Sequence, residues 1–230
     1  FVLSPRFFSE FFYNTKDLIF LTFFAIATNS LIVFTLKPSF RSAFLHAIAV
    51  GFAVDARMMG VIFIPLTIFI FLMRQLFAIK KRGDIQYLLC FVALCFLFIY
   101  LFWPWLWADP LNRFVEAFQK MAQFSRGSDR VLYFGEIVLT KELPWHYIPA
   151  WISISTPPLY VVLFVIGVSS TLFTFIKKYQ NIWSNDQDVQ DFIFSALFFG
   201  PLAAVILMKS VLYDGWRQMY FLYPSFLMLS

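Results

Sequence analysis

Long apolar stretches separated by short charged joints run through most of this chain. A helix needs roughly 20 apolar residues to cross a bilayer, and most of the stretches approach that length. The pattern predicts helical spans at 18–36, 43–56, 59–75, 86–102, 158–176, 192–208 and, in part, 219–230. A long polar and aromatic outer loop, 103–157, separates the fourth span from the fifth. We therefore expect an all-α, polytopic transmembrane protein, with residues 1–230 forming a fragment of one transmembrane domain.

The stretch from 43 to 73 is too long for one ordinary span. Asp55, Arg57 and Gly60 interrupt it, which predicts two short helices that meet at this joint. One long helix with a buried Asp55–Arg57 pair is the alternative. Because basic residues mark cytoplasmic loops, the two arrangements make different predictions for the sidedness of the chain.

Only the two-helix arrangement places all the basic loops on one face. These loops contain Lys37 and Arg41; Arg74, Lys80, Lys81 and Arg82; and Lys177 and Lys178. The opposite, outer face then holds residues 1–17, the joint around Asp55, the loop 103–157 and the joint around Asp214. The charge pattern thus favours two helices.

Composition supports a membrane environment and excludes several classes of protein. Hydrophobic residues make up 61% of the chain and charged residues only 13%, which is too apolar for a soluble core of this size. The net charge of +5 is explained by the basic loops and gives no indication of nucleic-acid binding. Cys90 and Cys95 lie in one apolar run and face different directions on a helix, so they predict apolar packing. The sequence has no nucleotide phosphate loop, serine-hydrolase elbow or HExxH motif.

The outer loop contains one strongly amphipathic segment. Asp109 and Pro110 are typical of a helix start. The apolar residues that follow at helical spacing are Leu111, Phe114, Val115, Phe118, Met121 and Ala122. This helix either lies on the membrane surface or packs on the rest of the outer loop. Trp103, Trp105 and Trp107 precede it and are typical of a membrane-interface belt.

A few charged residues near the outer face are candidates for chemistry. Asp17 opens the first span, where it could bind a divalent cation, act as a base, or only interact with the helix dipole. Arg6 and Glu10 are four residues apart and would share a helix face. The planar guanidinium of Arg6 could also hold a phosphate.

Two further candidates lie later in the chain. His146, in Pro144-Trp145-His146-Tyr147, has a catalytic or a purely structural role. Arg217 begins the last apolar run and either snorkels to the interface or anchors a lipid phosphate. Glu10 and Asp214 are candidates for supporting these residues.

Three segments resemble a known family. Ser4-Pro5-Arg6-Phe7-Phe8-Ser9-Glu10, followed by Lys16-Asp17 at the start of a span, resembles the second outer loop of the protein O-mannosyltransferase-like glycosyltransferases. These enzymes belong to the GT-C membrane superfamily, which includes the lipid A aminoarabinose transferases. Arg217-Gln218-Met219-Tyr220-Phe221-Leu222-Tyr223-Pro224 is similar to a segment that opens a later span in that family. The segment Pro144-Trp145-His146-Tyr147, which precedes Pro157-Pro158, is also similar to outer-loop segments of that family.

The resemblance implies a GT-C-like fold and a sugar transfer. The donor would be a polyprenyl-phosphate sugar, and the acceptor a protein, lipid or glycan at the periplasmic face of a bacterial inner membrane or the lumenal face of the endoplasmic reticulum. Asp17 would correspond to the second outer-loop acid, near Mg or Mn or near the donor phosphate, and Arg6 and Arg217 would contact that phosphate. Asp17 and His146 are the catalytic candidates in this chain.

The resemblance also places the principal catalytic acid in a first outer loop, which would precede Phe1. Two other functions remain open at the level of sequence. A transporter or flippase would explain the interrupted helix at 55–60. A non-catalytic membrane scaffold would need little more than the surface helix.

Overall fold

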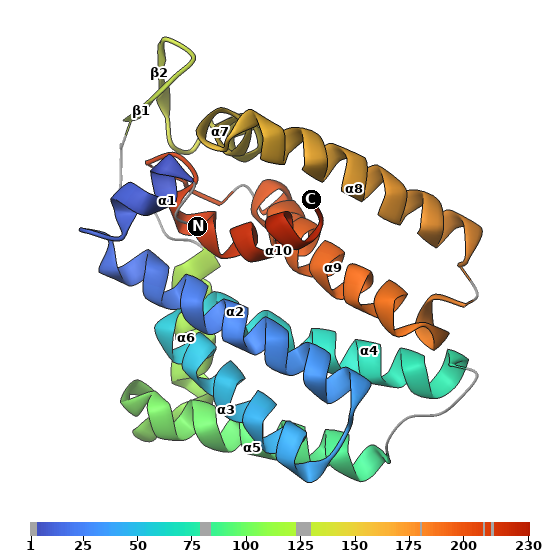
Figure 1. The fold of residues 1–230 in the computed structure, drawn as a ribbon. Coiled ribbons are helices and arrows are strands. Elements are labelled where there is room, and N and C mark those ends of the chain that lie inside the picture. The colour runs from blue at the N-terminus through green and yellow to red at the C-terminus, as the bar shows by residue number, and fades with distance from the viewer. Residues whose placement is uncertain (1–3, 79–83, 123–129, 180, 209, 213) are drawn as a thin grey trace. The chain divides into compact units, whose positions relative to one another are not determined.

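The computed structural model describes residues 4–78, 84–122, 130–179, 181–208, 210–212 and 214–230 (Figure 1). The contacts divide the chain into two compact units. The first unit comprises residues 1–18, 118–169 and 194–230, and the second comprises 19–117 and 170–193. The basic residues Lys80, Lys81 and Arg82, which were used to predict sidedness, lie outside the described residues.

Helices dominate both units, as the sequence predicts. The α-helices are α1 (Pro5–Glu10), α2 (Thr15–Leu36), α3 (Phe40–Ala56), α4 (Phe63–Phe77), α5 (Ile85–Phe102), α6 (Pro110–Ala122), α7 (Tyr147–Ser155), α8 (Pro158–Lys177), α9 (Asp186–Leu207) and α10 (Tyr223–Met228). The 3-10 helices are η1 (Met58–Ile62), η2 (Pro104–Trp107), η3 (Ile182–Ser184) and η4 (Arg217–Leu222). A small antiparallel hairpin, β1 (Arg130–Tyr133) and β2 (Glu136–Leu139), pairs Arg130 with Leu139 and Tyr133 with Glu136. This hairpin was not predicted.

Among the residues that the structure describes, five helical segments are long and apolar enough to cross a membrane. They are α2, the continuous Met58–Phe77 segment formed by η1 and α4, α5, α8 and α9. The segment expected to begin a last span is helical from Arg217 to Met228, with α10 following η4 directly. Pro224 lies in the first turn of α10, where its missing N–H and fixed φ suit a helix start.

The helix break near Asp55 is present, so the alternative of one continuous helix is wrong. α3 ends at Ala56, and Arg57 is extended, with φ −156° and ψ 138°, before η1 begins. Gly60 allows the chain to return closely, because a Cβ atom there would lie 2.6 Å from the backbone carbonyl carbon of Ala53. A larger residue at position 60 would therefore separate η1 from α3.

A histidine lies at the centre of the second unit. His46 on α3 is fully buried, and its ring stacks on Phe91 of α5 at a centroid distance of 4.6 Å. Nδ1 lies 2.8 Å from the Ser30 hydroxyl of α2, and Nε2 lies 2.9 Å from the Thr67 hydroxyl of α4. Phe34 stacks on the other rings of this core. The cluster thus joins all four helices of this unit's core through polar and aromatic contacts.

Aromatic packing in the first unit fixes α1 against η4. Phe7 is fully buried and stacks on Tyr223 with ring centroids 4.1 Å apart. Tyr220 and Trp216 contact the same ring at 4.7 and 5.6 Å. Because Arg6 and Glu10 flank Phe7 on α1, this packing brings their side chains to the start of η4.

Candidate functional site

The site begins with the short helix α1, which presents an acid and a base on one face. Pro5 is in the first turn, where proline favours helix initiation. Arg6 and Glu10 lie one turn apart, and Nη2 of Arg6 is 3.1 Å from Oε1 of Glu10. The expected pairing of these residues is confirmed. Glu10 is buried, so its charge needs the compensation that Arg6 supplies.

Asn14 connects α1 to the first turn of α2. Its Oδ1 accepts a hydrogen bond from the backbone N–H of Asp17 at 3.2 Å, which is the geometry of a helix N-cap. Its Nδ2 donates to Oε2 of Glu10 at 2.6 Å and to Oδ2 of Asp17 at 2.9 Å. One amide therefore holds two buried carboxylates in fixed positions.

Arg217 reaches Asp17 from the other end of the chain. Its Nε lies 3.0 Å from Oδ2 of Asp17, and its Nη1 donates to Oδ2 of Asp214 at 2.7 Å. The other oxygen of Asp214 lies 3.9 Å from Nη2 of Arg6. These contacts close a ring, which we call the ion-pair ring; its members are Arg6, Glu10, Asn14, Asp17, Arg217 and Asp214.

Asp214 is held in an unusual backbone conformation. Its φ is 58° and that of Gly215 is 68°. The left-handed region is uncommon for residues other than glycine, although aspartate is enriched there. Such conformations cost free energy and cluster at functional sites. The turn directs the Asp214 carboxylate toward both guanidinium groups of the ring.

Tyr220 of η4 hydrogen-bonds to two members of the ion-pair ring. Nε of Arg6 donates to the Tyr220 hydroxyl at 2.6 Å, and that hydroxyl donates to Oε1 of Glu10 at 3.1 Å. Burial raises the pKa of Tyr220 to about 12, against the lowering effect of Arg6, so the phenol is protonated at neutral pH and can donate. Burial alone would lower the pKa of Arg6, but Tyr220, Glu10 and Asp214 together raise it. Arg6 therefore carries a full positive charge.

Exposure differs sharply around the ion-pair ring. Glu10, Asn14 and Asp17 are buried, whereas Arg6 and Arg217 are partly exposed. The Asp214 side chain is 53% exposed and is the ring's most accessible member. The ring contains three carboxylates and two guanidinium groups. Asp214 contacts both arginines of the ring.

Five of the six predicted site residues converge in this ring. They are Arg6, Glu10, Asp17, Asp214 and Arg217. Sequence reasoning missed Asn14 and Tyr220. The position of Asn14 directly before a helix, three residues ahead of Asp17, is an N-cap signal that could have identified it. Tyr220 has no comparable local signal, because its partners lie at the opposite end of the chain.

The structure does not bring His146 into the ion-pair ring. Its Nδ1 lies 2.6 Å from the Tyr133 hydroxyl of β1, and its ring packs edge-on against Trp145. The adjacent Tyr147 does contact the turn that carries Asp214, since its hydroxyl accepts a hydrogen bond from Gly215 N–H at 3.1 Å. The catalytic role expected for His146 stays a prediction, and its observed contacts are those of a structural residue.

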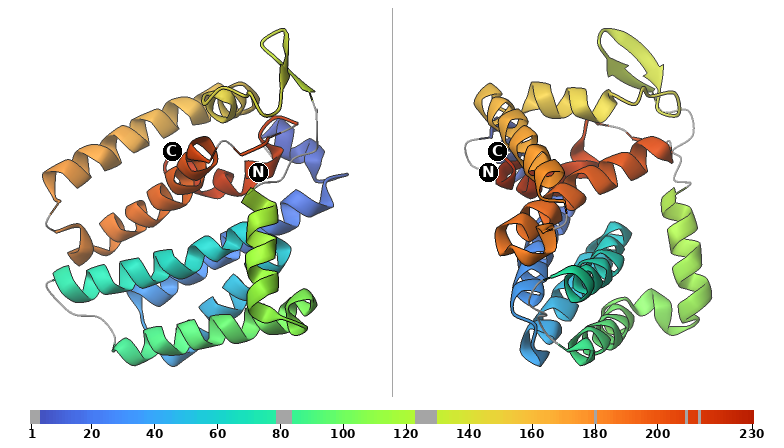
Figure 2. Two further views of the ribbon diagram at one scale, coloured as in Figure 1. Left: turned by 180° about the vertical axis from the view of Figure 1, so that it is seen from behind. Right: turned by 90° about the vertical axis from the view of Figure 1, so that its right-hand side faces the viewer.

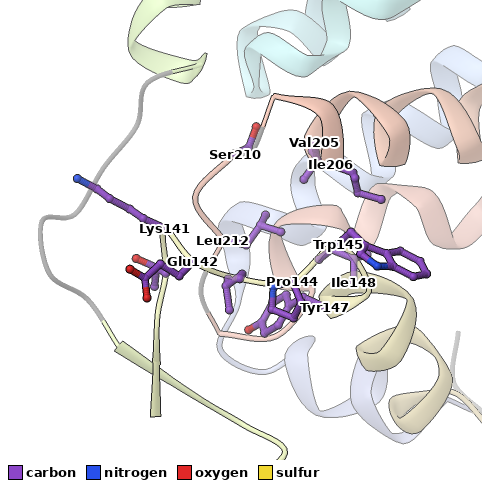
Figure 3. Close-up of a pocket in the computed structure, with 12 residues that line it drawn as sticks. Lys141, Glu142, Pro144, Trp145, Tyr147, Ile148, Val205, Ile206, Ser210 and Leu212 are labelled. Atoms are coloured by element: carbon purple, nitrogen blue, oxygen red, sulfur yellow. The ribbon is translucent and has the colours of Figure 1, made fainter. Parts of the chain in front are cut away.

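An open pocket of about 370 Å³ adjoins the same turn. Tyr147, Ile148 and Leu212 form part of its apolar lining, and Lys141 and Glu142 contribute polar atoms. In the close-up, Lys141 extends away from the apolar side chains (Figure 3). Of the lining residues, Leu212 is two residues before Asp214, and Tyr147 accepts a hydrogen bond from the Gly215 N–H.

The carboxylates of the ion-pair ring are engaged by guanidinium, amide and phenol groups. A cation site needs several oxygen ligands directed at one point. Oδ2 of Asp17 is engaged by Arg217 and Asn14, and Glu10 is engaged by Arg6, Asn14 and Tyr220. Within the described part of the chain, no group of three or more His, Cys, Asp or Glu residues is placed to hold a metal ion. The expected metal dependence stays a prediction.

The two cysteines are free, as the sequence predicts.

Comparisons with known proteins found no relative of this chain. No protein-family model, no curated protein and no solved structure matches it.

Proposed function

We propose that this chain is part of an integral membrane glycosyltransferase that moves a sugar from a polyprenyl-phosphate donor to an acceptor at the outer or lumenal face. The observation that carries the proposal is the ion-pair ring, which gathers Arg6, Asp17 and Arg217 from distant segments. Five helical segments with the length and composition of membrane spans support a bilayer location. The family resemblance of the segments around Arg6 and Arg217 supplies the reaction class.

The ring supports phosphate binding through the exposed sides of its two arginines. A guanidinium group offers a planar fork of donors that suits phosphate oxygens. Asp214 occupies the accessible position between Arg6 and Arg217, so its carboxylate marks a place that an anion can occupy. In the proposal, the donor phosphate displaces Asp214, while the buried Glu10 and Asp17 keep both guanidinium groups oriented.

The proposed reaction is a direct displacement at the anomeric carbon. The acceptor hydroxyl oxygen forms the new bond, the bond from the anomeric carbon to the phosphate oxygen breaks, and the phosphate leaves with the electron pair. Arg6 and Arg217 stabilise the charge that develops on this leaving group. The acceptor proton passes to a carboxylate, which the resemblance places in the first outer loop of that family. Asp17 acts here as a positioning residue for Arg217.

The pocket near the Asp214 turn has an apolar side that could hold the apolar part of the donor, and a polar side with Lys141 and Glu142. Its lining includes Trp145, Ile148 and Leu212, and apolar surfaces with a few polar groups are typical of ligand sites. The proposal assigns the first isoprene units of the donor to this space, next to the phosphate at the ring.

A transfer assay on the full-length protein in native membranes tests the proposal. Radiolabelled polyprenyl-phosphate mannose, glucose and aminoarabinose serve as donors, with wild type, Arg6→Ala, Arg217→Ala and Lys16→Ala compared. Loss of one charge-assisted hydrogen bond costs about 1.5–3 kcal/mol, so each arginine variant should lose about 10- to 100-fold in kcat/KM. Lys16 is exposed and adjacent to Asp17, so Lys16→Ala should retain activity. Equal activity of wild type and both arginine variants would remove the site from the proposal.

A transporter or flippase is a second candidate, and one observation favours it. The helix break between α3 and η1 leaves Arg57 in an extended backbone between two apolar helices, and broken helices are common in transporters. Uptake of labelled polyprenyl-phosphate sugar into sealed vesicles, without any transfer to an acceptor, would favour this function over the first.

A further inference from the structure

The helix α6 has an apolar face that is open in the structure. Leu111, Val115 and Phe118 follow a spacing of four and three residues and so lie on one side of the helix. Their exposed fractions are 81%, 53% and 43%. Asn112, Glu116 and Gln119 occupy the polar side. Large apolar side chains with this exposure indicate a surface that contacts something other than water.

The start of α6 contacts the tryptophan-rich turn, Trp103–Trp107, that follows α5. Asp109 caps α6, since its Oδ1 accepts a hydrogen bond from the backbone N–H of Asn112 at 3.3 Å. Nη1 of Arg113 donates to the Trp105 carbonyl oxygen at 2.7 Å, and the guanidinium carbon lies 4.4 Å from a Trp105 ring centroid. The rings of Trp103 and Phe114 meet edge-on at 6.4 Å. The direction of α6 is therefore set by the tryptophan-rich turn.

The axis of α6, drawn in light green, runs across the axis of α5 and not along it (Figure 2). α5 is one of the helices long and apolar enough to cross a membrane, and apolar side chains such as Leu89, Phe96 and Leu97 are exposed along it. If α5 crosses the bilayer, a helix that runs across its end lies in the plane of the membrane surface. Trp105 and Trp107 are exposed at the junction, where tryptophan is typical of the interface.

The charges on α6 indicate whether its apolar face would bind anionic or zwitterionic lipid. Arg113 is engaged by Trp105. Glu116 and Lys120 carry opposite charges at a spacing of four residues, the arrangement that pairs on a helix. The polar side of α6 therefore has no basic cluster for anionic headgroups. Binding through this helix must depend on apolar area.

We propose that α6 is an interfacial anchor whose face, Leu111, Val115 and Phe118, inserts into the headgroup region of a bilayer without a requirement for anionic lipid. The partner is the zwitterionic lipid surface, and the face continues the lipid-contacting surface of α5 through Trp105 and Trp107. The helix is about 20 Å long at 1.5 Å per residue, which is enough to fix the outer loop parallel to the membrane. This inference does not depend on the proposed enzymatic function.

Site-specific fluorescence on the full-length protein tests the proposal. In a background with Cys90→Ala and Cys95→Ala, single cysteines replace Leu111, Val115 or Phe118, and the matched controls replace Asn112, Glu116 or Gln119. Each variant is labelled with an environment-sensitive fluorophore and reconstituted into phosphatidylcholine vesicles with or without a doxyl-lipid quencher. Labels on the apolar face should be blue-shifted and quenched at least about threefold more than labels on the polar face. Adding phosphatidylserine at about one-third of the lipid should change quenching by less than about twofold.

Three results would overturn the proposal. Blue-shifted labels on the apolar face that the doxyl lipid does not quench would show that the face packs on protein. Equal water exposure of both faces would show that the apolar face of α6 contacts neither lipid nor protein. A strong dependence on phosphatidylserine would contradict the stated lipid class. Elution of each variant as a single symmetric peak with wild-type far-UV circular dichroism verifies that the labelled proteins are folded.

Discussion

Nε of Arg217 lies 3.0 Å from Oδ2 of Asp17, so the first residue of η4 neutralises an acid in the first turn of α2. Asp17 is only 5% exposed, and an unpaired carboxylate at such a position is costly. The pair therefore has a structural role in the first unit as well as the role proposed for it in phosphate binding. The two roles can be separated by experiment.

A double-mutant cycle measures the structural role. Arg217→Met leaves the buried Asp17 without its cation and should lower the free energy of unfolding by about 1–3 kcal/mol; the full cost of breaking a buried pair is reduced because Arg217 is partly exposed to solvent. Asp17→Asn combined with Arg217→Met should recover part of this loss. Thermal unfolding of the purified protein in detergent is the measurement. Strict additivity of the two single variants would show that the pair is not coupled.

Asp214→Asn tests whether the Asp214 carboxylate competes with an anionic donor. Asparagine tolerates the left-handed backbone seen at this residue, so the fold should be retained. Removing an exposed ion pair is worth about 0.2–1 kcal/mol, and we expect the KM for the lipid-phosphate donor to fall about two- to fivefold with kcat unchanged. Steady-state transfer kinetics supply the measurement. Glu136→Gln, an exposed acid on β2, is the control, and a raised KM in Asp214→Asn would contradict the competition.

His46 should contribute to stability mainly by filling space and less by hydrogen bonding. Ser30 and Thr67 also bond the carbonyl oxygens of Ala27 and Phe63 in their own helices, so they keep a partner if the imidazole is removed. His46→Leu should cost about 0.6–1.7 kcal/mol, whereas His46→Ala, which leaves a cavity beside Phe91, should cost about 2–5 kcal/mol. Unfolding in increasing fractions of sodium dodecyl sulfate compares them. Equal losses in both variants would show that hydrogen bonding dominates.

Gly167 on α8 should not tolerate a side chain. A Cβ atom there would overlap the carbonyl oxygen of Leu229, which follows α10, so Gly167→Ala should separate α8 from the end of α10. Overpacking of this kind costs about 1–3 kcal/mol, seen as a lower Tm. Ser169→Ala, on an exposed position of the same helix, should leave the Tm unchanged. A stable Gly167→Ala variant would indicate that α8 shifts without penalty.

Residues close together in sequence were the easiest to predict. The break after Ala56 followed from the charges at Asp55 and Arg57, and the start of α6 followed from Asp109 and Pro110, because both signals lie within one helical turn. The pairing of Arg6 with Glu10 depended only on helical spacing. These features need no knowledge of the rest of the fold.

Features that depend on turn geometry or distant contacts were missed. The β1–β2 hairpin turns at Phe134 and Gly135, both with positive φ, and phenylalanine is not among the residues typical of such turns. The link from Tyr220 to Arg6 depends on how Phe7 packs against η4, which no local pattern encodes.

The order of synthesis gives the ion-pair ring a further consequence. At about 5–20 residues per second, the ribosome makes Arg217 roughly 10–40 s after Asp17. Throughout that interval Asp17 lacks the contact with Arg217 that it makes in the finished fold. The ion-pair ring therefore closes only late in translation.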